Sequence, residues 1–417
     1  MNRFTRVHVV GAGMAGLAAA VRLADAGIAV RLYESAQAAG GRCRSYLDAT
    51  LGCRIDNGNH LLLSGNHAAM NYIAAIGARD TLIGPGETAF PFLDIASGER
   101  WVVRPGEGRV PWWVFDRSRR VAGTRIQDHL AALALLRAGP ERTVGELFDR
   151  KSVLFRRFFA PLTVAALNTG VEDASAALLA RVLKESFFRG GAACRPLVPR
   201  EGLSESLVDP ALAQLARRGG EVRYVARLRA LEFADDRVAA LGFEAGSESM
   251  GADHAVILAV PAPVATRLVP GLDAPDEFRA IVNAHYRVRA PAAAPYFVGV
   301  IGGTTEWVFR KREVLSVTVS AADRLVDMPS DELASLMWRE VEQAYELPPG
   351  PMPPVQIVKE RRATFAATPA QLKRRPPART RWRNLALAGD WTDTGLPATI
   401  EGAIRSGMAA AQTLLEA

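Results

Sequence analysis

Residues 9–35, VVGAGMAGLAAAVRLADAGIAVRLYES, place three glycines and an acidic residue in a fixed order. Gly11, Gly13 and Gly16 stand between a β-branched run and a helical pattern, and Glu34 ends the next strand pattern. In a βαβ unit these glycines permit a tight turn, let backbone approach a pyrophosphate, and let helix and strand pack closely. The helix N-terminus offers N–H groups to phosphate. The pattern predicts a dinucleotide-binding domain; the alternative is a purely structural turn.

A second glycine pair follows the acidic residue, in AAGGRCRS at residues 38–45. Gly40 and Gly41 allow close backbone approach, and Arg42 offers fixed donors to phosphate; the alternative is a surface turn with a solvated arginine. This segment resembles the second signature of the flavoprotein superfamily that contains amine oxidases and carotenoid desaturases, although Ala38 stands where those proteins often carry Arg. The resemblance implies FAD as the dinucleotide.

The far end of the chain carries a matching segment, RNLALAGDWTDTGLPATIEGAIRSG, at residues 383–407. A buried-type strand leads into Gly389 and Asp390, and a helix begins near Thr399. In the same superfamily such an aspartate lies at the ribityl and phosphate region, and the helix N-terminus favours negative charge on the reduced ring. From the three motifs, and from a backbone contact implied near Leu228, we expect these residues to bind FAD: Gly11, Ala12, Gly13, Met14, Ala15, Gly16, Glu34, Ser35, Gly40, Gly41, Arg42, Leu228, Gly389, Asp390, Thr399 and Ile400.

The order of patterns predicts an α/β fold, with a Rossmann-like FAD-binding domain of the amine-oxidase type and an inserted substrate domain of mixed α+β structure. We assign residues 1–75, 195–275 and 380–417 to the discontinuous FAD-binding domain, and residues 76–194 and 276–379 to the substrate-binding domain. Helices are expected at residues 129–139, 143–150, 155–170 and 175–188. Strands are expected within residues 285–325.

The charge balance limits the classes of partner that the protein is expected to bind. The chain carries 51 Lys and Arg against 44 Asp and Glu, a net charge of +7. This suits nucleic acid or anionic lipid, but no zinc-finger spacing, RNP signature or basic tail is found, so we expect no nucleic acid partner. Residues 109–120, RVPWWVFDRSRR, place tryptophans among arginines, which is typical of a membrane surface. The alternative is that these aromatic side chains pack under the substrate domain while the arginines stay solvated.

Other features bear on the compartment. No apolar run approaches the roughly 18 residues of a spanning helix. Cys43, Cys53 and Cys194 are scattered, so neither a disulfide framework nor a metal site is expected. The first strand pattern begins almost at once, with no signal peptide ahead of it. We therefore expect a cytoplasmic protein, peripherally associated with the inner membrane.

The stretch CRIDNGNHLLLSGNH, residues 53–67, is the one most suited to lie against the flavin. Its strand enters a turn that brings backbone onto the ring face, and we add Asn57, Gly58 and Asn59 to the FAD contacts. His60 titrates near neutral pH and is our first catalytic candidate; the alternative is a histidine that hydrogen-bonds backbone. Asp393 is the second candidate, and Asp56 is expected to anchor its own loop.

Five segments together resemble the hydroxysqualene dehydroxylase family over nearly the whole chain: DNGNHLLLSG, the P-W-W stretch, APLTVAALNTGVEDASAALL, LVPREGLSESLVDPALAQLARRGGEVR and TGLPATIEGAIRSG. The resemblance implies a hydrophobic polyprenyl substrate, hydroxysqualene, whose allylic hydroxyl is protonated and lost while reduced FAD supplies hydride, giving squalene for hopanoid biosynthesis. It also implies possible contact with other squalene-pathway enzymes. The alternatives are an oxidative carotenoid or squalene desaturase or an amine oxidase, and a non-catalytic lipid-escort protein on the same fold.

Overall fold

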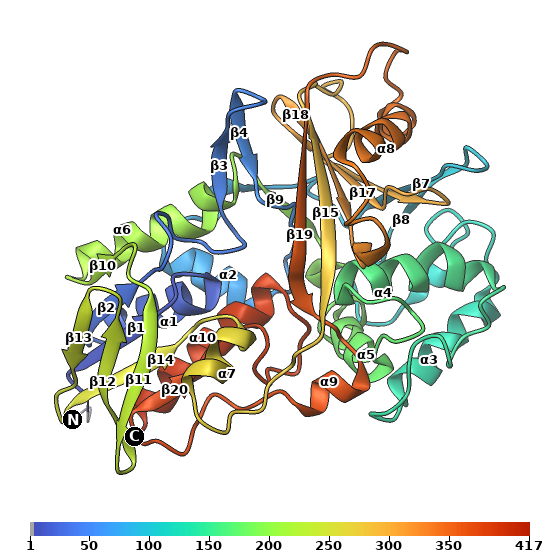
Figure 1. Cartoon of the computed structure of the whole chain (residues 1–417). Helices are drawn as coiled ribbons and strands as arrows, with labels where there is room; N and C mark the ends of the chain where they lie inside the picture. The colour runs from blue at the N-terminus through green and yellow to red at the C-terminus, as the bar shows by residue number, and fades with distance from the viewer. Residues whose placement is uncertain (1–3) are drawn as a thin grey trace.

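The computed structural model describes residues 4–417 and contains two large sheets (Figure 1). The first is a five-stranded sheet in which every neighbouring pair is parallel. Its order across the sheet is β10 (Glu221–Arg223), β2 (Ala29–Tyr33), β1 (Arg6–Val10), β14 (His254–Leu258) and β20 (Leu385–Leu387). The start, middle and end of the chain thus meet in one sheet.

Both faces of this sheet are covered, as its nearly continuous apolar strands require. Helices α1 (Met14–Asp25), α2 (His67–Ala75), α6 (Asp209–Arg217) and α10 (Ile400–Leu415) contribute to one apolar core. Helices α1 and α10 cross closely: a Cβ added to Gly407 would lie 2.0 Å from the Ala15 carbonyl oxygen. The opposite face packs against α7 (Ala262–Leu268) and an antiparallel sheet of β11 (Leu228–Ala234), β12 (Arg237–Phe243) and β13 (Gly246–Ser249).

The second large sheet has seven strands and one long covering helix, α8 (Ser330–Tyr345). Alternate residues of its central strands, such as Val282 and Ala284, pack into the core beneath α8. Asn283 and His285 therefore face the other way. The strand order is β19 (Val355–Phe365), β15 (Phe278–Tyr286), β18 (Val314–Val319), β17 (Trp307–Lys311), β16 (Phe297–Ile301), β7 (Phe90–Asp94) and β8 (Arg100–Val103).

A helical insert, at the lower right of Figure 1, packs its aromatic side chains against the face of this sheet opposite α8, at strands β7, β8, β16 and β17. Its elements are η2 (Trp112–Phe115), η3 (Ile126–Leu130), α3 (Ala131–Leu136), η4 (Phe155–Phe159), α4 (Ala160–Leu167), α5 (Ala176–Glu185), η5 (Phe187–Arg189) and η6 (Gly191–Ala193). The prediction of a helix at residues 143–150 is wrong. That segment turns back instead, because Thr143 bridges to Ser175 and the Gly145 N–H donates to the Val171 carbonyl at 2.8 Å.

Short elements join the large ones. They are β3 (Ser45–Asp48), β4 (Cys53–Asp56), β5 (Leu62–Leu63), η1 (Arg79–Thr81), β6 (Leu82–Ile83), β9 (Pro196–Pro199), η7 (Ser204–Val208), η8 (Ala322–Arg324) and α9 (Pro369–Lys373). Across residues 4–417, no helix has both the length and the apolar character needed to cross a membrane.

Candidate functional site

In the first glycine turn, Gly11 and Gly16 are closely packed, whereas Gly13 faces open space. A Cβ on Gly11 would lie 2.3 Å from the Ala259 carbonyl oxygen, and one on Gly16 would lie 1.8 Å from the Gly11 carbonyl oxygen. A Cβ on Gly13 would meet nothing within 4 Å. Gly13 is also the N-cap of α1, whose first turn carries no acidic side chain. The turn therefore presents open space and a helix N-terminus, which suits a pyrophosphate.

The second glycine turn completes the same surface. The Gly40 N–H donates to the Ala12 carbonyl at 2.8 Å, and Gly13 bridges to Gly40. A Cβ on Gly41 would lie 3.4 Å from the Gly13 Cα. Two glycine motifs that the sequence separates thus form one cradle without side chains.

Glu34 lies at the end of β2, where its side chain is held by backbone. Its carboxylate accepts N–H groups from Ala12 at 3.0 Å and Ala36 at 2.8 Å, and the Ser35 hydroxyl at 3.2 Å. Only 9% of Glu34 is exposed. A fixed carboxylate beside the phosphate turn suits ribose hydroxyls, which need an acceptor.

Leu228 begins β11 and is buried in the core under the five-stranded sheet. The hydrogen bonds to the Glu34 region come from slightly earlier in the chain. The Ala226 N–H donates to the Glu34 carbonyl at 2.8 Å, and the Val225 N–H donates to the Ala36 carbonyl at 3.1 Å. The chain just before Leu228 therefore borders the Glu34 end of the cradle.

The C-terminal motif meets the second glycine turn through an ion pair. Arg42 Nη2 lies 2.8 Å from Asp390 Oδ2, and the arginine also donates to the Ala363 carbonyl. The Asp390 carboxylate, itself buried, raises the pKa of Arg42. The Arg42 side chain nevertheless stays 43% exposed, so part of it faces space that a ligand can fill.

The start of α10 is fixed by its own cap. Thr399 Oγ1 accepts the Gly402 N–H at 3.0 Å, and Ile400 is the first residue of the helix. Upstream, the Gly389 N–H donates to Ser406 Oγ at 2.9 Å. The turn that carries Asp390 is thereby tied to α10, the helix that packs on α1.

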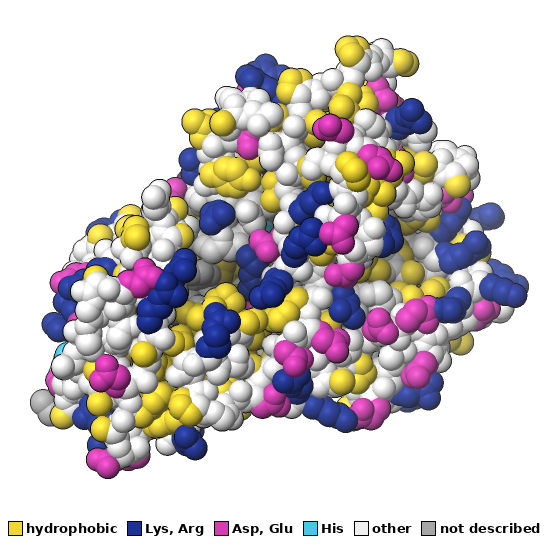
Figure 2. All heavy atoms as spheres, viewed as in Figure 1, with side chains coloured by type: hydrophobic (Ala, Val, Ile, Leu, Met, Phe, Trp, Pro, Cys, Tyr) yellow, Lys and Arg dark blue, Asp and Glu magenta, His cyan; other side chains and the backbone are white. Residues whose placement is uncertain are grey.

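These features fit FAD. The cradle is open only at Gly13, a helix N-terminus and an arginine face anionic groups, and a buried carboxylate stands where a ribose would lie. Figure 2 shows a hollow between the two halves of the molecule, with Lys and Arg side chains gathered around it. A dinucleotide with two phosphates has the charge that such a hollow attracts.

The loop of residues 57–60 connects this region to the seven-stranded sheet. The Asn57 N–H donates to the Arg44 carbonyl at 2.9 Å. A Cβ on Gly58 would lie 3.3 Å from Asn283 Nδ2, and Asn59 Nδ2 donates to Thr318 Oγ1 at 3.0 Å. The loop therefore touches the side chains of β15 and β18 directly.

Asp56 anchors this loop, which confirms the role predicted for it. Its carboxylate accepts the Ser45 hydroxyl at 2.6 Å and the Leu203 N–H at 2.9 Å, and it pairs with Lys311. Every one of these partners is structural. Asp56 is therefore not free to exchange protons with a substrate.

The two catalytic candidates have different surroundings. His60 is half-buried, with Nε2 3.9 Å from Cys43 Sγ. Burial, with the nearby positive charge of Arg42, lowers the pKa of His60 to about 4. Asp393 is exposed, and its Oδ1 accepts the Gly395 N–H at 3.2 Å. The assignment of a catalytic role to either residue stays a prediction.

Three polar residues of the large sheet were not anticipated from the sequence. Asn283 and Thr318 lie against the 57–60 loop, as described above. Glu306, just before β17, accepts the Ser320 N–H at 2.7 Å, and burial raises its pKa to about 7. For Asn283 and Thr318, the sequence signal available was a polar residue within an otherwise apolar strand.

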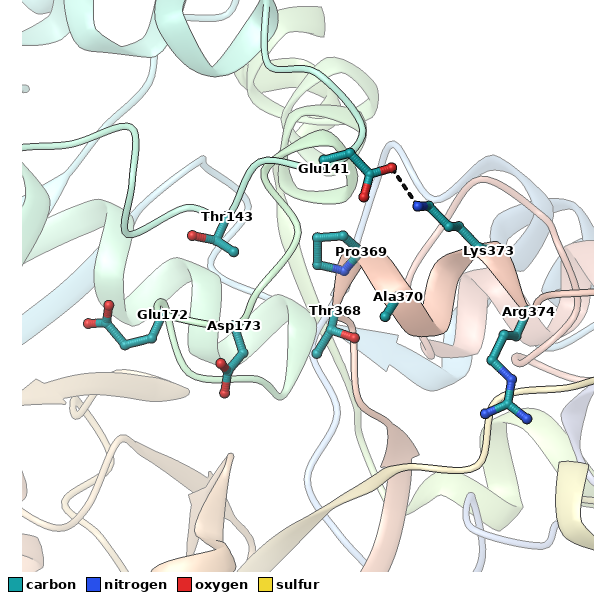
Figure 3. Close-up of a pocket in the computed structure, with 9 residues that line it drawn as sticks. All are labelled: Glu141, Thr143, Glu172, Asp173, Thr368, Pro369, Ala370, Lys373 and Arg374. Carbon is teal, nitrogen blue, oxygen red and sulfur yellow. Dashed lines mark ion pairs between the residues drawn. The ribbon is translucent and has the colours of Figure 1, made fainter.

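A separate cavity of about 530 Å³ lies between the helical insert and α9 (Figure 3). Its rim carries charges of both signs, including the Glu141–Lys373 ion pair at 2.8 Å. None of its nine lining residues belongs to the glycine motifs or to the 57–60 loop. This cavity is therefore distinct from the FAD cradle.

Residues 14–415 match the family described as flavin-containing amine oxidoreductase. The chain belongs to this family, its cofactor is FAD, and the predicted α/β FAD-binding fold is confirmed. Cyclohexylamine oxidase from Brevibacterium oxydans shares the fold, with a TM-score of 0.70 and 15% identity over 99% of each chain.

Two curated relatives narrow the assignment. Hydroxysqualene dehydroxylase of Rhodopseudomonas palustris is 52% identical over 99% of this chain and 98% of its own length. The protein of the same name from Sinorhizobium fredii is 49% identical over 98% of each chain. Within the flavoprotein family, this chain belongs to the hydroxysqualene dehydroxylases.

Proposed function

We propose that this protein reductively removes the hydroxyl group of hydroxysqualene, forming squalene and water for squalene and hopanoid biosynthesis. The observation that carries the proposal is 52% identity to a hydroxysqualene dehydroxylase over 99% of the chain. One proton and one hydride enter: the C–O bond breaks, the proton leaves with the oxygen as water, and a C–H bond forms. Reduced FAD supplies the hydride.

The chain's own residues have three tasks in this reaction. The glycine cradle, Glu34 and the Arg42–Asp390 pair would hold the cofactor. The 57–60 loop would set the reacting carbon between the cofactor and the large sheet. Aromatic side chains of the helical insert and of β16, β17 and β7 would exclude water from the allylic cation. We propose that the FAD-binding domain comprises residues 1–75, 195–275 and 380–417, and the substrate-binding domain residues 76–194 and 276–379.

The proton is proposed to come from His60, with Asp393 in reserve. An acid that protonates a leaving hydroxyl must approach within about 3 Å of it. His60 belongs to the loop that contacts both halves of the molecule, whereas Asp393 lies in an exposed turn. This difference in position favours His60.

The test is a single turnover with defined electrons. FAD-loaded protein is photoreduced without oxygen and mixed with hydroxysqualene, squalene or phytoene, and the lipid products are identified by mass spectrometry. We expect squalene from hydroxysqualene, with one flavin reoxidised per product. Oxidation of squalene or phytoene by the unreduced enzyme would favour a desaturase. A flavin that no lipid reoxidises would favour a lipid-escort protein.

We also propose that the protein contacts an anionic membrane at the cytoplasmic face. Among residues 4–417, six of the eleven exposed large hydrophobic residues lie within residues 110–133. They include Trp112, 71% exposed, and Phe115, 59% exposed. Residues 104–137 carry seven arginines and three acidic residues, a net +4 (7 − 3) of the chain's +7. Exposed aromatic residues among arginines suit anionic headgroups.

Trp113 behaves differently from its neighbour. It is half-buried, packs beside Gly106 and meets His129 edge-on at 6.0 Å between ring centroids. Replacing Trp112 and Phe115 with Ser should therefore release the protein from anionic liposomes without unfolding it, whereas Leu336→Ser, at an exposed site elsewhere, should not. Cosedimentation checks this, and unchanged binding of the double variant would refute the membrane contact.

A further inference from the structure

We infer that Asn283 is the residue that binds the hydroxyl group of the substrate, so that its amide selects an alcohol over the corresponding hydrocarbon. The inference rests on the proposed function for the identity of the alcohol. It concerns a residue of the seven-stranded sheet that lies far in sequence from every cofactor motif.

Asn283 faces the cofactor side of the sheet. Its neighbours Val282 and Ala284 are buried beneath α8, so the Asn283 side chain points to the opposite face. On that face its amide nitrogen lies 3.3 Å from where a Cβ on Gly58 would be. A glycine at position 58 therefore lets the loop and the amide approach each other closely.

A chain of hydrogen bonds fixes which way the amide points. Asn59 Nδ2 donates to Thr318 Oγ1 at 3.0 Å, and it also points to the Val317 carbonyl at 3.5 Å, which only a donor can satisfy. Thr318 Oγ1 in turn donates to Asn283 Oδ1 at 2.8 Å. With the oxygen of Asn283 engaged, its Nδ2 must point away from Thr318.

This arrangement leaves a donor without an acceptor. Asn283 as a whole is only 1% exposed, and no hydrogen bond from its Nδ2 to another residue is found within residues 4–417. Among the described residues this nitrogen is not one of the fully buried unpaired atoms, so it borders accessible space. At the other end of this series of hydrogen bonds, the buried Asn59 Oδ1 lacks a hydrogen-bond partner. An amide donor that has no protein acceptor and borders accessible space beside the loop is free to bind a ligand atom that accepts a hydrogen bond. A hydroxyl oxygen is such an atom, and squalene has none.

The residues that pair across the strands from Asn283 are mostly aromatic, which suits a hydrocarbon. Register pairs connect Asn283 to Thr318 and then, across neighbouring strands, to Trp307, Gly299, Phe92 and Trp101. Paired residues share one face. Phe92 lies 5.5 Å from Trp307 and 5.6 Å from Trp101 between ring centroids. The face thus changes from amide and hydroxyl to aromatic, as a molecule with one hydroxyl and a long hydrocarbon requires.

The experiment measures ligand binding without turnover. Oxidised, FAD-loaded protein is titrated with hydroxysqualene and with squalene in the same detergent micelles, and the flavin absorbance reports the Kd of each. Asn283→Leu removes the amide at similar volume. Thr318→Val removes the hydroxyl that orients the amide and serves if Asn283→Leu fails to fold. Ser316→Ala is the control, because Ser316 lies on the same face but bonds His285 instead.

We expect Asn283→Leu to raise the Kd of hydroxysqualene by about tenfold or more, the effect of one lost buried hydrogen bond, and to leave the Kd of squalene within about twofold. Thr318→Val should act in the same direction, and Ser316→Ala should change neither Kd. Equal shifts for both ligands, or none, would overturn the inference. A changed flavin spectrum before any ligand is added would also overturn it, because the amide would then contact the flavin. Because no turnover is involved, an inactive enzyme would refute the proposed function and leave this test readable.

Discussion

The identity of the proton donor can be decided by the direction in which the rate changes with pH. The pKa of His60 is lowered to about 4, because burial disfavours the charged ring and Arg42 lies nearby. At pH 7 about one molecule in a thousand would then carry imidazolium. If imidazolium is the acid, the rate should rise about tenfold per pH unit on acidification, or about 100-fold between pH 7 and pH 5.

Glu306 gives a contrasting profile. Its pKa is raised to about 7 by burial. If this carboxyl were the acid, the rate should level off below about pH 6 and fall above pH 7, because the protonated form is already abundant in mild acid. Between pH 7 and pH 5 the rate should rise only about twofold with Glu306 as the acid, so the two profiles differ by about 50-fold in relative rate at pH 5.

The assay follows flavin reoxidation after anaerobic mixing of photoreduced protein with hydroxysqualene. His60→Ala should keep FAD bound and reducible, slow the step by roughly 100-fold or more at pH 5, and lose the acid-side slope. Cys43→Ala is the matched control, since it removes a neighbour 3.9 Å from the ring and leaves the imidazole. A near-normal rate in His60→Ala would refute the reasoning and move the role to Asp393, a tyrosine or bound water.

Two further predictions concern the cofactor and acid stability. Glu34→Ala should weaken FAD retention by about 100-fold or more, because two backbone N–H groups and the ribose lose their acceptor, whereas Glu87→Ala, at an exposed glutamate outside the cofactor motifs, should change it little; full FAD occupancy after gel filtration would contradict the ribose role. His8 is fully buried and its pKa is lowered to about 4 from 6.5, so its contribution to stability is complete above pH 6.5 and is lost as pH falls toward 4. Between pH 7 and pH 5, the wild type should therefore lose about 2 kcal/mol more free energy of unfolding, measured in urea, than His8→Leu loses. An equal loss in both proteins would count against this role of His8.

The cofactor site could be predicted from the sequence because its chemistry is local. A turn that holds a pyrophosphate needs glycines within a few residues, and the acid that ends the next strand follows at a nearly fixed spacing. The contact between Arg42 and Asp390 could not be read in this way. Each residue belonged to a recognised motif, but 348 positions (390 − 42) separate them and only the folded chain makes the pair.

The polar groups of the large sheet were missed for a different reason. Asn283 meets Thr318 only because β15 and β18 pair in one register, and a shift by one residue would turn Asn283 toward α8. Strand patterns predict that a strand exists but not which residue of another strand lies opposite. The pKa of His60 also depends on the folded chain, because burial and the charge of Arg42 lower it.

The 57–60 loop explains how one fold can set a cofactor and a substrate at a defined separation. Its base is fixed by Asp56, which binds Ser45 and Leu203 of the cofactor side and Lys311 of the large sheet. Its tip rests on Asn283 through Gly58. Both halves of the molecule are therefore positioned by short contacts to buried side chains, chiefly those of Asp56 and Asn283, with little freedom to move. Hydride transfer needs such a fixed distance, because a cation that waits for its hydride reacts with water instead.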